Sequence, residues 1–63
     1  MVLYNLYLVL NDEPIMIYDK CMKMMRFEGS SNDIPEILFD RYVHYMTIAR
    51  IHKGDYKQLI VID

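Results

Sequence analysis

The chain has 63 residues, of which 54% are hydrophobic, and a formal net charge of −2. A chain of this length makes one domain with a small core, so residues 1–63 are expected to fold as a single unit. The near-neutral charge argues against a basic nucleic-acid-binding surface, and no apolar run approaches the roughly 20 residues of a membrane span.

The first apolar stretch, residues 3–10, fits two kinds of secondary structure. Its apolar residues at positions 3, 6, 7 and 10 have the spacing of an amphipathic helix, whereas those at positions 4, 6, 8 and 10 alternate as in a strand. Pro14 would end a helix or open the next strand. Periodicity leaves the two alternatives open.

A β-hairpin is predicted next. Ile15–Asp19 reads as a short strand, residues 19–21 as a turn and Met24–Glu28 as the partner strand, followed by a loop at residues 29–32. Strict alternation divides the partner strand into two faces, Met25 with Phe27 and Arg26 with Glu28.

A short helix is predicted from Ile34 to about Arg41. Asp33 has the position of an N-cap, and Glu36 comes three residues later, as in a capping box. Pro35 suits the first turn of a helix, where its missing N–H costs nothing. The expected buried stripe is Ile34, Ile37 and Leu38, with Glu36 and Asp40 facing water.

The last third is predicted to be a second hairpin, with strands at residues 42–52 and 56–62 and a turn at Lys53-Gly54-Asp55. The first strand has two faces by alternation: Val43, Tyr45, Thr47, Ala49 and Ile51 on one, and Tyr42, His44, Met46, Ile48, Arg50 and His52 on the other. The continuous apolar run Leu59–Ile62 indicates a strand that is central or covered on both faces. The predicted fold class is α+β: a small antiparallel sheet of two hairpins, one short central helix and a possible N-terminal helix.

Three segments together resemble a known group of sequences. Ile17-Tyr18-Asp19, Phe27-Glu28-Gly29 and the stretch 33–43 resemble a loose group of small, uncharacterised phage and prophage proteins that share an FEG…DIPxxLxDRxV pattern. In the group the helix itself reads DIPxxLLDRxV, and Phe39 stands in place of its second Leu, which changes core volume and not chemistry. The resemblance implies a mobile-element origin and an α+β architecture, and it favours a helix at residues 3–10. It brings no catalytic motif.

The residues that could carry chemistry do not form a recognisable site. His44 and His52 are eight residues apart on one strand face, which separates them by roughly 26 Å, so they share a metal only across a dimer axis. Cys21 has no adjacent histidine to activate it. Asp33, Glu36 and Asp40 serve more simply to cap and solvate a helix. We expect no catalytic residue, no cofactor and no metal, and so not an enzyme.

The aromatic residues indicate an interface. Tyr, Met and Arg are enriched at protein–protein contacts, and one strand face carries Tyr42, His44, Met46 and Arg50. A chain this small has little interior for so many apolar side chains, although some rings could simply cover the core. We therefore expect a homo-oligomer, a dimer or higher, with these four residues at the interface.

The functional hypothesis combines these points. The chain is expected to be a small phage or mobile-element protein that binds a host protein, for example as an inhibitor of a host system such as antiviral defence. The single cysteine fits the reducing cytoplasm of the host cell. The alternative is a nucleic-acid-binding oligomer with a basic sheet face that would comprise Lys20, Lys23, Arg26, Arg50, Lys53 and Lys57, interleaved with Tyr56.

Overall fold

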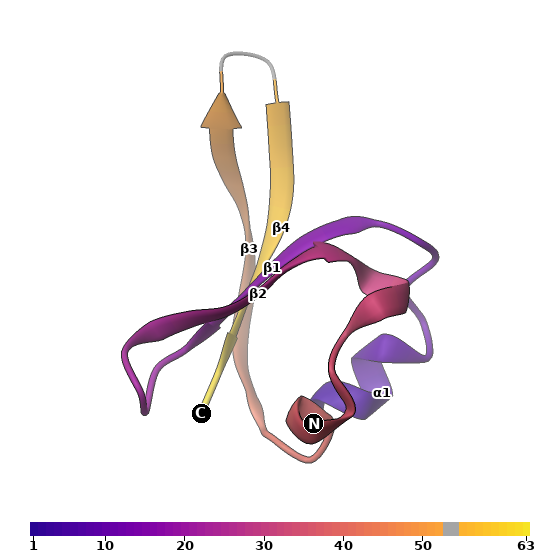
Figure 1. The fold of residues 1–63 in the computed structure, drawn as a ribbon, viewed down its shortest axis with the longest axis vertical. Helices are drawn as coiled ribbons and strands as arrows, with labels where there is room; N and C mark the ends of the chain where they lie inside the picture. Colours follow the sequence, from indigo (N-terminus) through magenta and orange to yellow (C-terminus); the bar gives the residue numbers. More distant parts are fainter. Residues whose placement is uncertain (53–54) are drawn as a thin grey trace.

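The computed structural model of the protein describes residues 1–52 and 55–63 and shows an α+β fold (Figure 1). Its elements in chain order are α1 (Leu3–Tyr7), β1 (Pro14–Asp19), β2 (Met24–Ser30), the 3₁₀ turns η1 (Ser31–Asp33) and η2 (Glu36–Leu38), β3 (Val43–His52) and β4 (Asp55–Ile62). The predicted fold class and both predicted hairpins are confirmed, and the first ambiguous stretch contains a helix. The turn predicted at Lys53-Gly54 lies outside the described residues.

The four strands form one sheet in the order β2-β1-β4-β3. Each hairpin is antiparallel, but β1 and β4 run parallel where the hairpins meet, so the sheet is not antiparallel throughout as predicted. This order places the most apolar strand of each hairpin in the middle of the sheet. The prediction that Leu59–Ile62 belongs to a central strand is confirmed, because Ile60 and Ile62 are fully buried.

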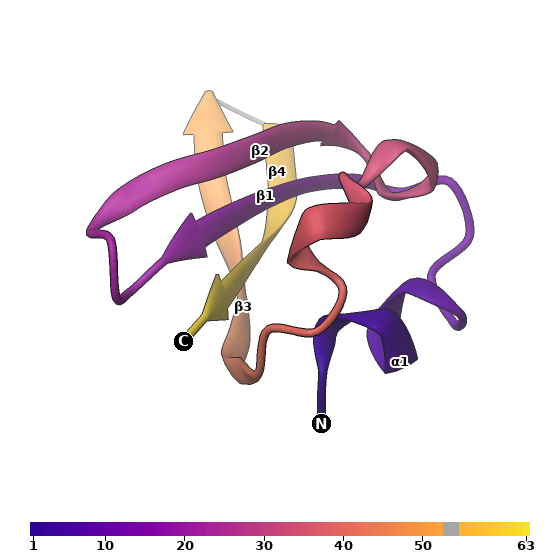
Figure 2. The ribbon, with the colours of Figure 1, turned by 60° about the horizontal axis from the view of Figure 1, so that its bottom comes forward.

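Helix α1 and the 3₁₀ turns lie on the same side of β1 and β2 and form a covering layer (Figure 2). The sheet face beneath this layer is called the covered face here. The core between layer and sheet is made of aliphatic side chains from both, namely Leu3, Leu6, Ile15, Ile17, Ile34, Leu38, Ile60 and Ile62. Burial of this kind of surface supplies most of the stability of a small domain.

Helix α1 is anchored by its first turn. The amides of Leu3 and Tyr4 donate to the carbonyl oxygens of Arg41 and Phe39, at 2.8 and 3.0 Å. These two bonds satisfy N–H groups that a helix cannot pair internally. The Phe39 ring also packs on Tyr7, with ring centroids 4.8 Å apart. A helix too short to be stable alone is thus fixed by the chain that follows η2.

The predicted helix from Ile34 to Arg41 is wrong. Ile34 is extended, with φ −58° and ψ 127°, and it separates η1 from η2. The ring of Pro35 disfavours helical backbone at the preceding residue, and this restriction prevails over the cap signal of Asp33. The side chain of Ser30, and not Asp33, accepts a bond from the first 3₁₀ turn. Ile34 and Leu38 are buried as predicted, but Ile37 is 76% exposed.

Two irregularities in strand pairing overturn the predicted face assignments. In β2, Phe27 pairs with Ile17 and Met25 pairs with Tyr18, so Met25 and Phe27 lie on opposite faces, and the register shifts at the residue between them. An extra residue of this kind is a β-bulge, which resets the alternation beyond it. A second shift between Val43 and Tyr45 places Val43 on the covered face, opposite Ile62.

A buried ion cluster joins the layers at one end of the sheet. Asp19, the last residue of β1, is fully buried. Its carboxylate accepts two bonds from the Arg41 guanidinium, at 2.8 and 2.9 Å, one from Arg26 at 2.9 Å and one from the backbone amide of Met22 at 3.0 Å. Arg41 Nε donates in turn to the carbonyl oxygen of Asp63. The cluster therefore ties both strands of the first hairpin, at its turn end, to the segment after η2 and to the end of β4.

The Arg41 hydrogen bonds hold the pKa of Asp19 well below its ordinary value, although burial opposes them. In the unfolded chain the same carboxyl titrates near about pH 4. The stabilisation is therefore fully present above about pH 4 and is lost as the pH falls toward the depressed native pKa, because the unfolded state then binds the proton first.

Replacing Asp19 with Asn should lower the melting temperature markedly at pH 7, because two guanidinium groups lose their charge partner. Thermal unfolding followed by circular dichroism between pH 2 and pH 7 measures this. The wild-type melting temperature should drop below about pH 4, and the drop should be smaller in Asp19→Asn. Asp33→Asn is the matched control and should melt within a degree or two of wild type, since Asp33 is exposed. Equal melting of the two variants would contradict this role of Asp19.

The 3₁₀ geometry of η2 predicts opposite outcomes for neighbouring residues. Leu38→Ala should cost about 2–5 kcal/mol of unfolding free energy, the usual range for a buried Leu. Ile37→Ala should change it by less than about 0.5 kcal/mol, because the side chain is already in water. Denaturant titration of both variants measures the two changes in unfolding free energy. A loss at Ile37 comparable to that at Leu38 would support the helix predicted from the sequence instead.

Candidate functional site

The residues considered for chemistry lie apart from one another. Cys21 is exposed in the turn between β1 and β2, and Asp33, Glu36 and Asp40 are exposed along the covering layer. Among the described residues no three His, Cys, Asp or Glu side chains come together where they could hold a metal ion. The side chain of His52 lies outside the part of the chain that the structure describes.

His44 is part of a surface chain of polar groups. Lys20 Nζ lies 3.4 Å from His44 Nε2, and His44 Nδ1 lies 3.5 Å from an Asp63 carboxylate oxygen. Lysine can only donate, so His44 Nε2 is the acceptor in this contact. The three side chains are exposed and contact one another on the surface.

The β3–β4 hairpin projects beyond the covering layer (Figure 1). Met46 and Ile48 on β3 share the covered face with Ile60, since they pair with Ile60 and Gln58 of β4. None of the described elements lies over this part of the face: Ile48 is 69% and Tyr56 57% exposed. The same sheet face is therefore core at one end and apolar surface at the other.

The surface at the base of this projection is slightly hollowed. One hollow of about 200 Å³ lies between the start of β1 and the hairpin and is lined by Glu13, Pro14, Ile48, Tyr56, Lys57 and Gln58. A second, of about 260 Å³, is lined by Met46, Thr47, Ile48 and Gln58. Both are smaller than the roughly 300–1,000 Å³ typical of small-molecule sites. Their size and openness suit side chains of another polypeptide better than an enclosed ligand.

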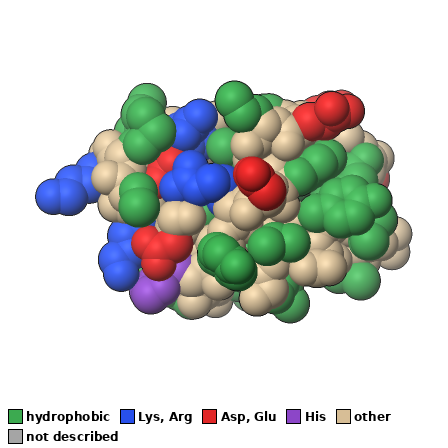
Figure 3. Space-filling view, turned by 90° about the horizontal axis from the view of Figure 1, so that it is seen from below, with side chains coloured by type: hydrophobic (Ala, Val, Ile, Leu, Met, Phe, Trp, Pro, Cys, Tyr) green, Lys and Arg blue, Asp and Glu red, His purple; other side chains and the backbone are tan. Residues whose placement is uncertain are grey.

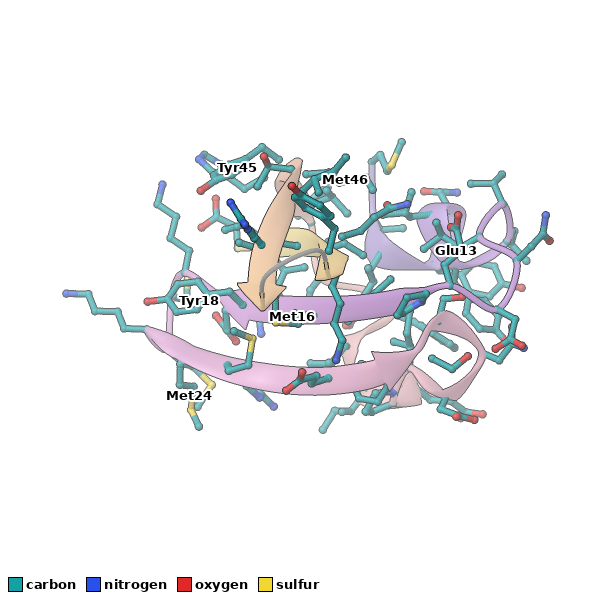
Figure 4. All side chains as sticks on the ribbon, turned by 90° about the horizontal axis from the view of Figure 1, so that it is seen from above. Glu13, Met16, Tyr18, Met24, Tyr45 and Met46 are labelled. Atoms are coloured by element: carbon teal, nitrogen blue, oxygen red, sulfur yellow. The ribbon has the colours of Figure 1, made fainter. Side chains whose placement is uncertain are left out.

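Strand β3 forms one edge of the sheet, and Figure 4 shows Tyr45 and Met46 on it, at the edge away from Met24 of β2. The start of β3 is covered on its outer side, where the amide of Val43 donates to the carbonyl oxygen of Met1 at 2.9 Å. The remaining length of the edge has no such neighbour among the described residues. It carries Tyr45, 52% exposed, next to Met46 and Ile48.

The four predicted interface residues all lie on or next to β3. Tyr42, His44, Met46 and Arg50 are exposed. Met46 and Arg50 share a face, whereas the irregularity between Val43 and Tyr45 places Tyr42 on the opposite face and leaves His44 as the extra residue outside the pair register. The prediction omitted Ile48, which lies between Met46 and Arg50 on the same face, and Tyr56, which pairs with Arg50. Alternation already indicated Ile48; the position of Tyr56 depends on the pairing of β3 with β4.

The basic residues proposed for nucleic-acid binding do not share a face. Arg26 turns toward Asp19 on the covered face, whereas Lys57 lies on the opposite face and pairs with Glu28 at 2.6 Å. Figure 3 shows Lys and Arg side chains gathered at one end of the molecule, among acidic groups and beside a histidine. Lys53 lies outside the described residues. Cations already paired with carboxylates have less to gain from binding phosphate.

Comparison with protein-family models, with curated protein sequences and with solved structures finds no match to this chain. None of the described helices has the length and apolar character needed to cross a membrane.

The split basic surface predicts weak nucleic-acid binding. The purified chain should not be retained on immobilised single-stranded DNA at about 0.15 M salt, because few unpaired cations face one side. Elution across a salt gradient measures this. Retention that weakens steeply with salt would favour the nucleic-acid alternative instead.

Proposed function

We propose that this chain is a protein-binding module that works as a homo-oligomer, and that its exposed apolar surface on β3 and β4 makes the contacts. In the biological setting that the sequence pattern suggests, it is a small phage or mobile-element protein in the host cytoplasm. There it binds a host protein and inhibits a host system such as antiviral defence.

The distribution of apolar side chains carries the proposal. Among the described residues, thirteen large apolar side chains are exposed, whereas nine form the buried core. Monomeric proteins rarely expose contiguous apolar surface beyond a few hundred Å² unless a partner covers it. Five of the exposed side chains lie on or beside β3 and β4, namely Tyr42, Tyr45, Met46, Ile48 and Tyr56. Tyr at such a surface supplies contact area at low cost in conformational entropy, and Met is enriched at interfaces and adapts its shape to a partner.

Binding is favoured over catalysis by the same geometry. The strongly perturbed carboxyl, Asp19, is fully buried and fully hydrogen-bonded, so a substrate cannot reach it. His44 and Cys21 are exposed and lie in no enclosed pocket among the described residues. Catalysis by such groups needs a shaped, water-excluding site.

Partner binding should depend on the β3 surface and not on the candidate catalytic groups. The tagged chain is used to capture a protein from bacterial lysate, and the dissociation constant of the purified pair is then measured for each variant. Tyr42→Ala or Arg50→Ala should weaken binding at least about fivefold, the effect of a contact residue worth about 1 kcal/mol.

Cys21→Ser and His44→Gln are the controls and should each bind within about twofold of wild type. The proposal fails if no variant on β3 changes binding. It also fails if the single substitution Cys21→Ser abolishes partner binding in a chain that remains folded.

A further inference from the structure

We infer that the partner of the free β3 edge is a second copy of this chain. Two β3 strands pair antiparallel across a two-fold axis at Thr47 and join the two sheets into one of eight strands. This inference rests on the proposed function, since it identifies the interface of the proposed homo-oligomer.

The two edges of the sheet differ in how they are protected. Edge strand β2 contains Arg26 and Glu28 and a register shift, and charges and bulges are the devices that prevent edge-to-edge pairing. Edge strand β3 has none of these devices between Tyr45 and Ala49, where the sequence is Tyr-Met-Thr-Ile-Ala. Pairing at β3 therefore uses the unprotected edge of each copy and leaves only protected edges outside. The assembly closes at two chains.

Symmetry and charge fix the register. Directly opposed residues of an antiparallel pair point to the same face. The two-fold axis must therefore lie midway between the two copies of one residue, and not between two different residues. With the axis at Thr47, Met46 lies opposite the partner's Ile48, and Tyr45 lies opposite the partner's Ala49. Moving the axis to Ile48 would set Arg50 against Met46, and moving it to Met46 would bring the irregular segment at His44 alongside Ile48. Only the Thr47 axis pairs apolar residues with apolar residues on both faces.

The antiparallel pairing also gives the projecting hairpin a neighbour. The covering layer lies at the beginning of β3, and the bare part of the covered face lies toward its end (Figure 1). In the dimer the end of one β3 meets the beginning of the other. The exposed side chains of Ile48 and Tyr56 in one copy then lie toward the covering layer of its partner.

The available area sets the expected strength. The exposed apolar side chains on and beside β3 amount to about 500 Å² per chain, taking about 150–250 Å² for each large side chain and the fraction of it that is exposed. The total of about 1,000 Å² is at the low end for a specific interface, to which the backbone hydrogen bonds of the paired edges add. A dimer that forms at micromolar concentration is expected.

Light scattering on the purified chain, with no host protein present, tests the association. At about 100 µM the wild type should have twice the chain mass of 7.6 kDa. Ile48→Lys should be monomeric, because it places a charge in the paired strands. Ile37→Lys is the matched control: it makes the same change at a side chain of similar exposure, 76% against 69%, and should remain dimeric. Circular dichroism confirms that each variant is folded.

Disulfide formation tests the register. In a Cys21→Ser background, Thr47→Cys should oxidise to a covalent dimer, because the two Cα atoms at the axis lie about 4.5–5.5 Å apart, within disulfide range. Ile48→Cys should not form a covalent dimer. The two copies of residue 48 are offset by two positions along the paired strands, so their Cα atoms lie about 8 Å apart.

A monomeric wild type at about 100 µM, or an Ile48→Lys variant as dimeric as wild type, overturns the inference. Preferential cross-linking at position 48 overturns the Thr47 axis. In a chain that stays monomeric yet captures a host protein with its β3 strand, the protein-binding proposal survives and the second copy is excluded.

Discussion

The rest of the structure depends on the buried carboxylate of Asp19. It lies where four parts of the chain meet: the end of β1, the turn into β2, the segment after η2 and the end of β4. A buried charge is expensive unless it is paired and fully hydrogen-bonded, and here Arg41, Arg26 and a backbone amide satisfy it. The geometry is therefore demanding, because misplacing any one of these segments leaves a charge unpaired in the interior. In a domain with so small an aliphatic core, this cluster specifies one arrangement of the two hairpins.

Several of the residues on which the sequence resemblance rests belong to this framework. Asp19 and Arg41 form the ion cluster, Ile34 and Leu38 are core residues, and Phe27 packs against the core from β2. Phe39, which departs from the pattern, contacts Tyr4 and Tyr7 and helps to fix α1. A resemblance confined to such residues concerns the fold. The exposed side chains of β3 from Tyr45 onward lie outside the pattern, whereas Tyr42 lies within it.

The proposed function rests on an imbalance in size between the sheet and the layer that covers it. One short helix and two 3₁₀ turns cover only part of one face of the sheet, while β3 and β4 continue past them. A fold with this shape presents an apolar face and an open strand edge side by side. Both features are used in β-strand addition, in which backbone hydrogen bonds provide affinity and side-chain contacts provide specificity. The proposed dimer uses the edge, and the remaining apolar surface is free for another protein.

The sequence by itself determined the local elements: the two hairpins, the central position of Leu59–Ile62 and the α+β class follow from alternation, apolar runs and turn residues that act over a few positions. It left the helix at Asp33 undecided, because a favourable cap competes with the backbone restriction before Pro35, and in the structure the restriction prevails. It could not place Met25, Phe27 and Val43, because a single bulge reverses all faces beyond it and bulges follow from long-range pairing. The parallel contact of β1 with β4, the role of Asp19 and the bare end of the sheet arise only in the tertiary structure, because each requires residues distant in sequence to meet. The sequence therefore indicated the strand that carries the candidate surface, through Met46 and Arg50. It did not indicate how far the surface extends, since Tyr56 joins it only through strand pairing.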